Sequence, residues 1–127
     1  MVGLLIITHN KVGQAIFDAA TSVLGSCPLA YKVLAVSQDC EPAELIKKAQ
    51  GYVNELNQGD GVLVVTDMYG STPSNIATKM ACANVDIITG INLPMLVRIM
   101  NYPDLPLNEL KEKAVSGGQA GVMIVEQ

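Results

Sequence analysis

The sequence predicts a single three-layer α/β domain over residues 1–127, with a mostly parallel sheet covered by helices on both faces. The first observation is the alternation of short apolar runs, rich in Val, Ile and Leu, with segments whose apolar residues recur at helical spacing. This alternation is typical of β-α-β units with right-handed crossovers. The second observation is the length of the chain, since 127 residues are enough for one domain with its own hydrophobic core.

Five apolar runs are the expected strands. The first stands at the N-terminus, where residues 2–7 are apolar without alternation and lead through Thr8 to His9. Such continuous runs are typical of strands buried on both faces of a sheet. The other expected strands are residues 31–36, 61–66, 86–90 and 121–125. The first four are predicted to be parallel, and the last is expected to sit differently.

The expected helices lie between these runs and cover residues 11–24, 41–56, 72–81, 93–100 and 107–115. In the first helix the apolar side chains form one stripe, made by Val12, Ile16, Ala19, Ala20, Val23 and Leu24. Thr72 is expected to cap the third helix, with Pro73 in its first position. Gly117 and Gly118 are expected to lead from the last helix into the final strand.

Composition excludes several classes of function. A formal net charge of −4 argues against a nucleic-acid binder, which needs a basic surface. One histidine and three scattered cysteines, Cys27, Cys40 and Cys82, predict reduced thiols and neither a metal site nor a cofactor. No apolar stretch reaches the length of about 18 residues that spans a membrane, and the N-terminus lacks the features of a signal peptide. The sequence therefore predicts a cytoplasmic protein.

Two polar residues at the carboxyl ends of predicted strands are the candidates for a chemical role. His9 ends the first strand and Asp67 follows the third. If these strands are neighbours, as in the flavodoxin-like order 2-1-3-4, both side chains emerge at the carboxyl edge of the sheet, where α/β proteins bind ligands. An aspartate bonded to one imidazole nitrogen fixes the tautomer and presents the other nitrogen as a nucleophile. Thr72, at a helix start, would offer backbone N–H groups to an anion.

Each residue also has a purely structural interpretation. Thr72 could serve only as a helix cap, and Asp67 could hold a turn. The flexible side chains of Met68, Tyr69 and Met95 could pack in the core rather than face a partner. Two other functions remain open on the residues alone. One is a hydrolase triad of Ser71, His9 and Asp67, although the G-x-S-x-G elbow is missing, and the other is a flavodoxin-like nucleotide-binding module without catalysis.

Three motifs resemble one family. Leu5-Ile6-Ile7-Thr8-His9, the segment from Val64 to Asn75, and Gly90-Ile91-Asn92-Leu93-Pro94-Met95-Leu96 are similar to the enzyme IIA domain of the mannose/fructose/sorbose family of the phosphoenolpyruvate-dependent sugar phosphotransferase system. The resemblance implies four parallel strands plus an antiparallel fifth, here residues 120–126, exchanged between the chains of a homodimer. It spans nearly the whole chain.

The resemblance also implies residue roles. His9 would accept a phosphoryl group from the phosphorylated histidine-containing phosphocarrier protein and pass it to an enzyme IIB, with Asp67 as the acid beside it. Thr72 would bind phosphate, together with its neighbours Gly70 and Ser71. The candidate docking positions are Met68, Tyr69, Pro94 and Met95. Asn10 and Ser71 depart from the family, which commonly has glycine there.

The resemblance leaves the biological role open. Sugar uptake, a regulatory role and the phosphotransfer subunit of the dihydroxyacetone kinase system are all compatible with these motifs. Because the sequence reaches Gln127 without a linker, we expect the IIB partner to be a separate polypeptide, with the membrane reached only through a permease.

Overall fold

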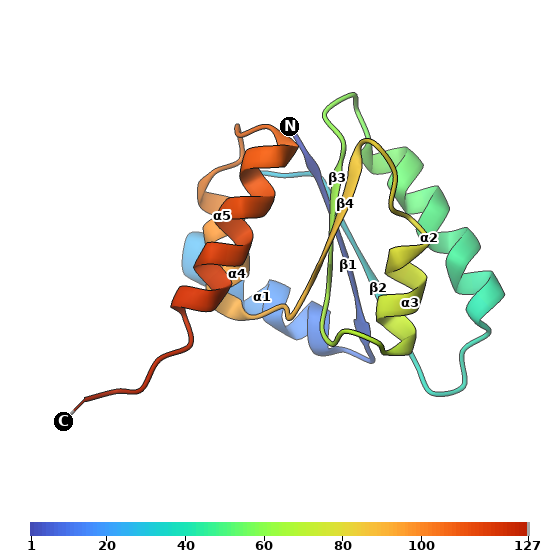
Figure 1. The fold of residues 1–127 in the computed structure, drawn as a ribbon, viewed down its shortest axis with the longest axis horizontal. Helices are drawn as coiled ribbons and strands as arrows, with labels where there is room; N and C mark the ends of the chain where they lie inside the picture. Colours follow the sequence, from blue (N-terminus) through green and yellow to red (C-terminus); the bar gives the residue numbers. More distant parts are fainter. Residues whose placement is uncertain (127) are drawn as a thin grey trace.

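In the computed structural model, which describes residues 1–126, four strands form one parallel sheet in the order β2-β1-β3-β4. They are β1 (Gly3–His9), β2 (Tyr31–Val36), β3 (Val62–Thr66) and β4 (Val85–Thr89). The helices are α1 (Val12–Leu24), α2 (Pro42–Leu56), α3 (Thr72–Thr78), α4 (Leu93–Asn101) and α5 (Leu107–Ala120). The predicted α/β class and the strand order 2-1-3-4 are confirmed, and β1 and β3 are neighbours (Figure 1).

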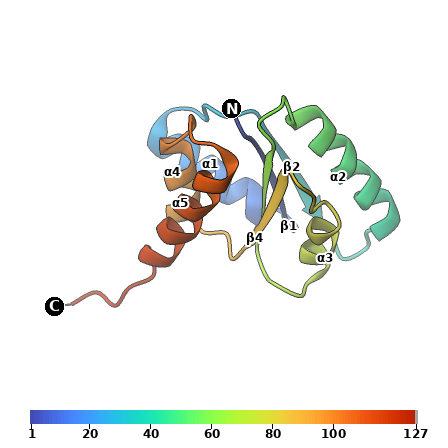
Figure 2. The same cartoon turned by 45° about the horizontal axis from the view of Figure 1, so that its top comes forward.

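Helices cover both faces of the sheet, as predicted. α1, α4 and α5 pack on one face, and α2 and α3 pack on the other (Figures 1 and 2). Side chains of β1 alternate between the two clusters, with Leu4 and Ile6 on the α1 side and Leu5 and Ile7 on the α2 side. Because β1 is buried on both faces, its sequence is apolar without alternation.

The buried face of α1 differs from the predicted stripe. Gly13, Phe17 and Ala20 are buried, whereas Val12 and Val23 are exposed. The reason is a close approach of the helix to β1, since a Cβ on Gly13 would lie 2.6 Å from Cγ2 of Ile6. Only a glycine fits there, and the helix turns its glycine rather than its first valine toward the sheet.

The last helix continues beyond the predicted end, through Gly117 and Gly118 to Ala120. Both glycines lie where α5 packs against α4. A Cβ on Gly117 would stand 2.6 Å from Cβ of Arg98, and the side-chain amide of Asn92 donates a hydrogen bond of 3.1 Å to the carbonyl of Gly118. These glycines therefore permit close helix packing and do not end the helix.

Residues 122–126 form no strand in this single chain and lead away from the domain (Figure 1). The side chains from Val122 to Val125 are 70–89% exposed. The antiparallel fifth strand and its exchange between two chains therefore remain predictions, and Gln127 lies outside the described residues. Within residues 1–126, no helix has the length and apolarity needed to cross a bilayer.

Candidate functional site

His9 is the last residue of β1, at the carboxyl edge of the sheet. Its register partner in β2 is Val36. Since side chains alternate along a strand, His9 lies on the same face as Leu5 and Ile7, the face covered by α2 and α3. Asn10 then takes a left-handed conformation with φ of 46°, and its N–H donates to the Val36 carbonyl at 3.0 Å. Asn10 can adopt this conformation where most residues other than glycine are strained.

Asp67 directly contacts the histidine, as the sequence predicted. Nδ1 of His9 lies 2.8 Å from Oδ2 of Asp67, which also accepts the backbone N–H of His9 at 3.1 Å. The other oxygen, Oδ1, accepts the backbone N–H of Met68 at 3.1 Å. Because a carboxylate can only accept, this contact places the proton on Nδ1 and leaves the lone pair on Nε2.

The contact with His9 keeps Asp67 charged. Burial raises the pKa of this carboxyl, but hydrogen bonds from the His9 ring and backbone, with the attraction of the ring, outweigh burial and hold the pKa below its usual value. Because the folded pKa is lowered, the carboxylate contributes stability that is present above the unfolded pKa and lost as pH falls through the folded pKa. At neutral pH the acid next to His9 is therefore an anion.

The loop after Asp67 has a different cap from the predicted one. Ser71, not Thr72, is the N-cap of α3, and its Oγ accepts the backbone N–H of Ser74 at 3.4 Å and donates to the Met68 carbonyl at 2.5 Å. Thr72 is the first residue of the helix. Gly70 has a φ of 82°, a conformation that favours glycine. The serine that departs from the family pattern thus acts as the helix cap.

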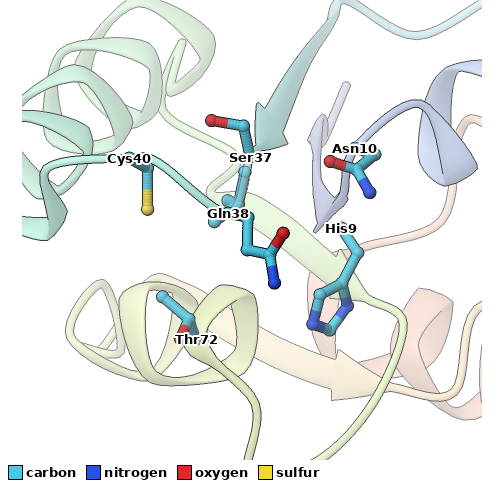
Figure 3. Close-up of a pocket in the computed structure, with 7 residues that line it drawn as sticks. His9, Asn10, Ser37, Gln38, Cys40 and Thr72 are labelled. Atoms are coloured by element: carbon cyan, nitrogen blue, oxygen red, sulfur yellow. The ribbon is translucent and has the colours of Figure 1, made fainter.

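A pocket of about 510 Å³ lies beside the histidine (Figure 3). It is lined by His9, Asn10, Val36, Ser37, Gln38, Cys40 and Thr72. The lining contains polar side chains but no lysine, arginine, aspartate or glutamate. The hydrophobic pattern of the sequence does not indicate the wall that Ser37, Gln38 and Cys40 form. The register of β2 beside β1 would have indicated it, since the segment after β2 emerges next to His9.

The predicted docking residues divide into two groups. Met68 and Tyr69, directly after Asp67, are 60% and 83% exposed, and Pro94 is also exposed at the start of α4. Met95 is 4% exposed and packs against Gly118 of α5. The packing of α4 against α5 buries the Met95 side chain in this chain, so a docking role for Met95 stays a prediction that its burial does not support.

The hydrolase interpretation requires a serine bonded to the histidine. Among residues 1–126, the ring of His9 hydrogen-bonds only to Asp67, while Ser71 directs its hydroxyl to the carbonyl of Met68. The structure does not assemble a triad of Ser71, His9 and Asp67. The described part of the chain also contains no group of three His, Cys, Asp or Glu residues suited to a metal ion.

Known proteins that are similar to this chain in sequence or in structure are components of the same kind of system. The chain is 29% identical over 126 residues to the PTS system mannose-specific EIIAB component of Escherichia coli K12, covering 95% of this chain and 38% of that protein. The mannose/sorbose specific IIA subunit from Enterococcus faecalis superimposes with a TM-score of 0.87 at 19% identity, covering 99% of this chain and 96% of that one.

A second solved structure is similar at higher sequence identity. The PTS IIA protein associated with the fucose utilization operon from Streptococcus pneumoniae gives a TM-score of 0.84 at 25% identity, with 98% of this chain and 96% of that one covered. The family model described as PTS system fructose IIA component matches residues 3–115. This match extends from β1 into α5, and the chain therefore belongs to the EIIA-man family of PTS IIA components.

Proposed function

We propose that this chain is a cytoplasmic phosphoryl carrier of a sugar phosphotransferase system, with Nε2 of His9 as the acceptor atom. One observation carries the proposal, namely the 2.8 Å contact between Nδ1 of His9 and Oδ2 of Asp67. It assigns the proton to Nδ1 and gives Nε2 the lone pair that a nucleophile needs. The His9 side chain is 42% exposed, which leaves room for a donor protein to approach.

The donor in this proposal is the phosphorylated histidine-containing phosphocarrier protein. The lone pair of Nε2 of His9 forms a bond to phosphorus while the donor's P–N bond breaks and its electron pair returns to the donor imidazole. The proton on Nδ1 stays in its bond to Asp67, whose charge balances the positive charge that develops on the ring. Transfer to a IIB component repeats the step with His9 as the leaving group, and the membrane is involved only through a permease.

The phosphoryl group would lie in the pocket beside His9. Thr72 is supported as a phosphate-binding residue because it lines this pocket. Ser71 and Gly70 are assigned a supporting role, since the hydroxyl of Ser71 caps α3 and Gly70 supplies the turn before it. Met68 and Tyr69, exposed beside Asp67, would contact the partner proteins.

The test is a labelling reaction. Incubation with phosphoenolpyruvate, enzyme I and the phosphocarrier protein should place one acid-labile, base-stable phosphoryl group on each chain, because phosphohistidine is an N–P species. The control omits enzyme I and should give no label. A label stable in acid would indicate a serine or threonine ester and would contradict the proposal, as would no label at all.

We also propose that the chain forms a homodimer by exchanging residues 120–126. The four side chains from Val122 to Val125 are exposed in a single chain, and an apolar segment of this kind promotes pairing with a strand edge. β4 is the edge of the sheet that such a strand could extend. Sedimentation at micromolar concentration should give twice the mass of one chain. A monomer under these conditions would refute strand exchange.

A further inference from the structure

Gln38 lies in the connection between β2 and α2, close to the candidate nucleophile. Val36, the last residue of β2, is the register partner of His9, and both lie on the face covered by α2 and α3. Two residues later the chain reaches Gln38, which lines the same pocket as His9 and Thr72. The strand register therefore places Gln38 beside the histidine.

A turn fixes the backbone under this side chain. The N–H of Cys40 donates to the carbonyl of Ser37 at 3.2 Å, which makes Gln38 and Asp39 the two central residues of a β-turn. Figure 3 shows the Gln38 side chain extending into the space between the His9 ring and Thr72, whereas the Ser37 hydroxyl points away from the ring. Gln38 thus presents its amide to the place where a group on Nε2 would lie.

The pocket needs hydrogen-bond donors, because a phosphoryl group is an anion and no lysine or arginine lines the cavity. A primary amide carries two N–H donors. Gln38 is exposed, and within residues 1–126 its side-chain amide has no hydrogen-bond partner, so both donors are available to a ligand. A neutral donor also steadies an anion without the strong attraction of a full positive charge, which suits a group that has to leave again.

We propose that the side-chain amide of Gln38 donates a hydrogen bond to the phosphoryl group on Nε2 of His9. Gln38 is then a phosphoryl-binding residue that faces Thr72 across the pocket. This inference rests on the proposed function of His9. No covalent bond forms or breaks at Gln38, which contributes to positioning and charge stabilisation only.

The first test compares rates of His9 phosphorylation. Gln38→Ala removes the donors and should slow single-turnover phosphorylation about tenfold, the lower end of the effect of losing a hydrogen bond to a charged group. Gln38→Glu keeps the size of the side chain, removes the donors and adds a negative charge, so it should be slower than Gln38→Ala. The matched control is Asp39→Asn, in the same turn but outside the pocket lining, and it should stay within about twofold of the parent.

The second test follows the side-chain amide of Gln38 directly. In an ¹⁵N-labelled protein, the side-chain amide signals of Gln38, assigned by their absence in Gln38→Ala, should shift when His9 is phosphorylated. His9→Ala treated identically should show no such shift. A Gln38 side chain that stayed away from the phosphoryl group would show no shift in either protein.

The outcomes separate the two proposals. If the parent chain takes no acid-labile label, the proposed function fails before Gln38 is tested. If the parent is labelled normally but Gln38→Ala reacts at the parental rate and the amide signals of Gln38 do not move, the carrier function stands and the role of Gln38 is refuted.

Discussion

His9→Ala should take up no phosphoryl group from the phosphocarrier protein, under conditions in which the parent takes one per chain. The loss should be complete because His9 is the only histidine among 127 residues, and no second imidazole can form the N–P bond. The variant should still fold. The ring of His9 is partly exposed, and Asp67 keeps two backbone donors, from residue 9 and from Met68, when the ring is removed.

His9→Asn is the matched control for this substitution. Its amide nitrogen can stand near the position of Nδ1 and donate to Asp67, so it preserves the hydrogen bond without supplying a nucleophile. Thermal unfolding should place His9→Asn within about 1 kcal/mol of the parent, the usual net value of one hydrogen bond. Both variants should remain unlabelled. Label on either one would mean that another residue carries the phosphoryl group and would overturn the assignment of His9.

The central pair of the site could be predicted because it depends on topology. Once β1 and β3 are neighbours, residues at the carboxyl ends of the two strands meet at one edge of the sheet, and Nδ1 of His9 lies 2.8 Å from Oδ2 of Asp67. The strand order itself was a hypothesis that the apolar pattern did not dictate. The pattern locates strands and helices but contains no signal for which strands pair.

Other parts of the site could not be predicted, because hydrophobic periodicity contains no information about polar turns, helix caps or glycines. The wall containing Gln38 is a polar turn, and its position follows from the register between β1 and β2. Ser71 and Thr72 both carry hydroxyls before Pro73, and proline is accepted in the first turn after either cap. On α1, the pattern of apolar side chains gives no weight to Gly13, because glycine has no side chain. Its lack of a Cβ nevertheless decides which face of α1 packs against β1.

A pocket without lysine or arginine suits a protein that passes its phosphoryl group on, because no full positive charge holds the group in place. Asp67 would repel a phosphoryl group about 6 Å away by roughly 2–3 kcal/mol per unit charge at an effective dielectric near 20. Neutral donors such as the amide of Gln38 and the hydroxyl of Thr72 would offset part of that repulsion. Release would then cost little, and transfer could run in either direction with small changes in free energy.

Asp67→Asn should slow phosphorylation of His9 by about 10²–10³-fold, and the geometry identifies charge as the main reason. Oδ2 accepts both the backbone N–H and Nδ1 of His9, while Oδ1 accepts the exposed N–H of Met68. An asparagine that keeps its oxygen at the Oδ2 position loses only the hydrogen bond from the backbone N–H of Met68, and this exposed N–H can hydrogen-bond to water instead. The favourable tautomer of His9 is then retained.

What Asp67→Asn removes is the negative charge that balances the ring as Nε2 bonds to phosphorus. At about 4–6 Å and an effective dielectric near 20, this interaction is worth roughly 3–4 kcal/mol, and every 1.36 kcal/mol changes a rate about tenfold. The measurement is a single-turnover rate, with the phosphorylated ring nitrogen assigned by NMR. Phosphohistidine that does form should persist longer than in the parent, because the repulsion has gone. Phosphorylation on Nδ1 in the parent, or an Asp67→Asn variant as fast as the parent, would show that this carboxylate neither orients nor balances His9.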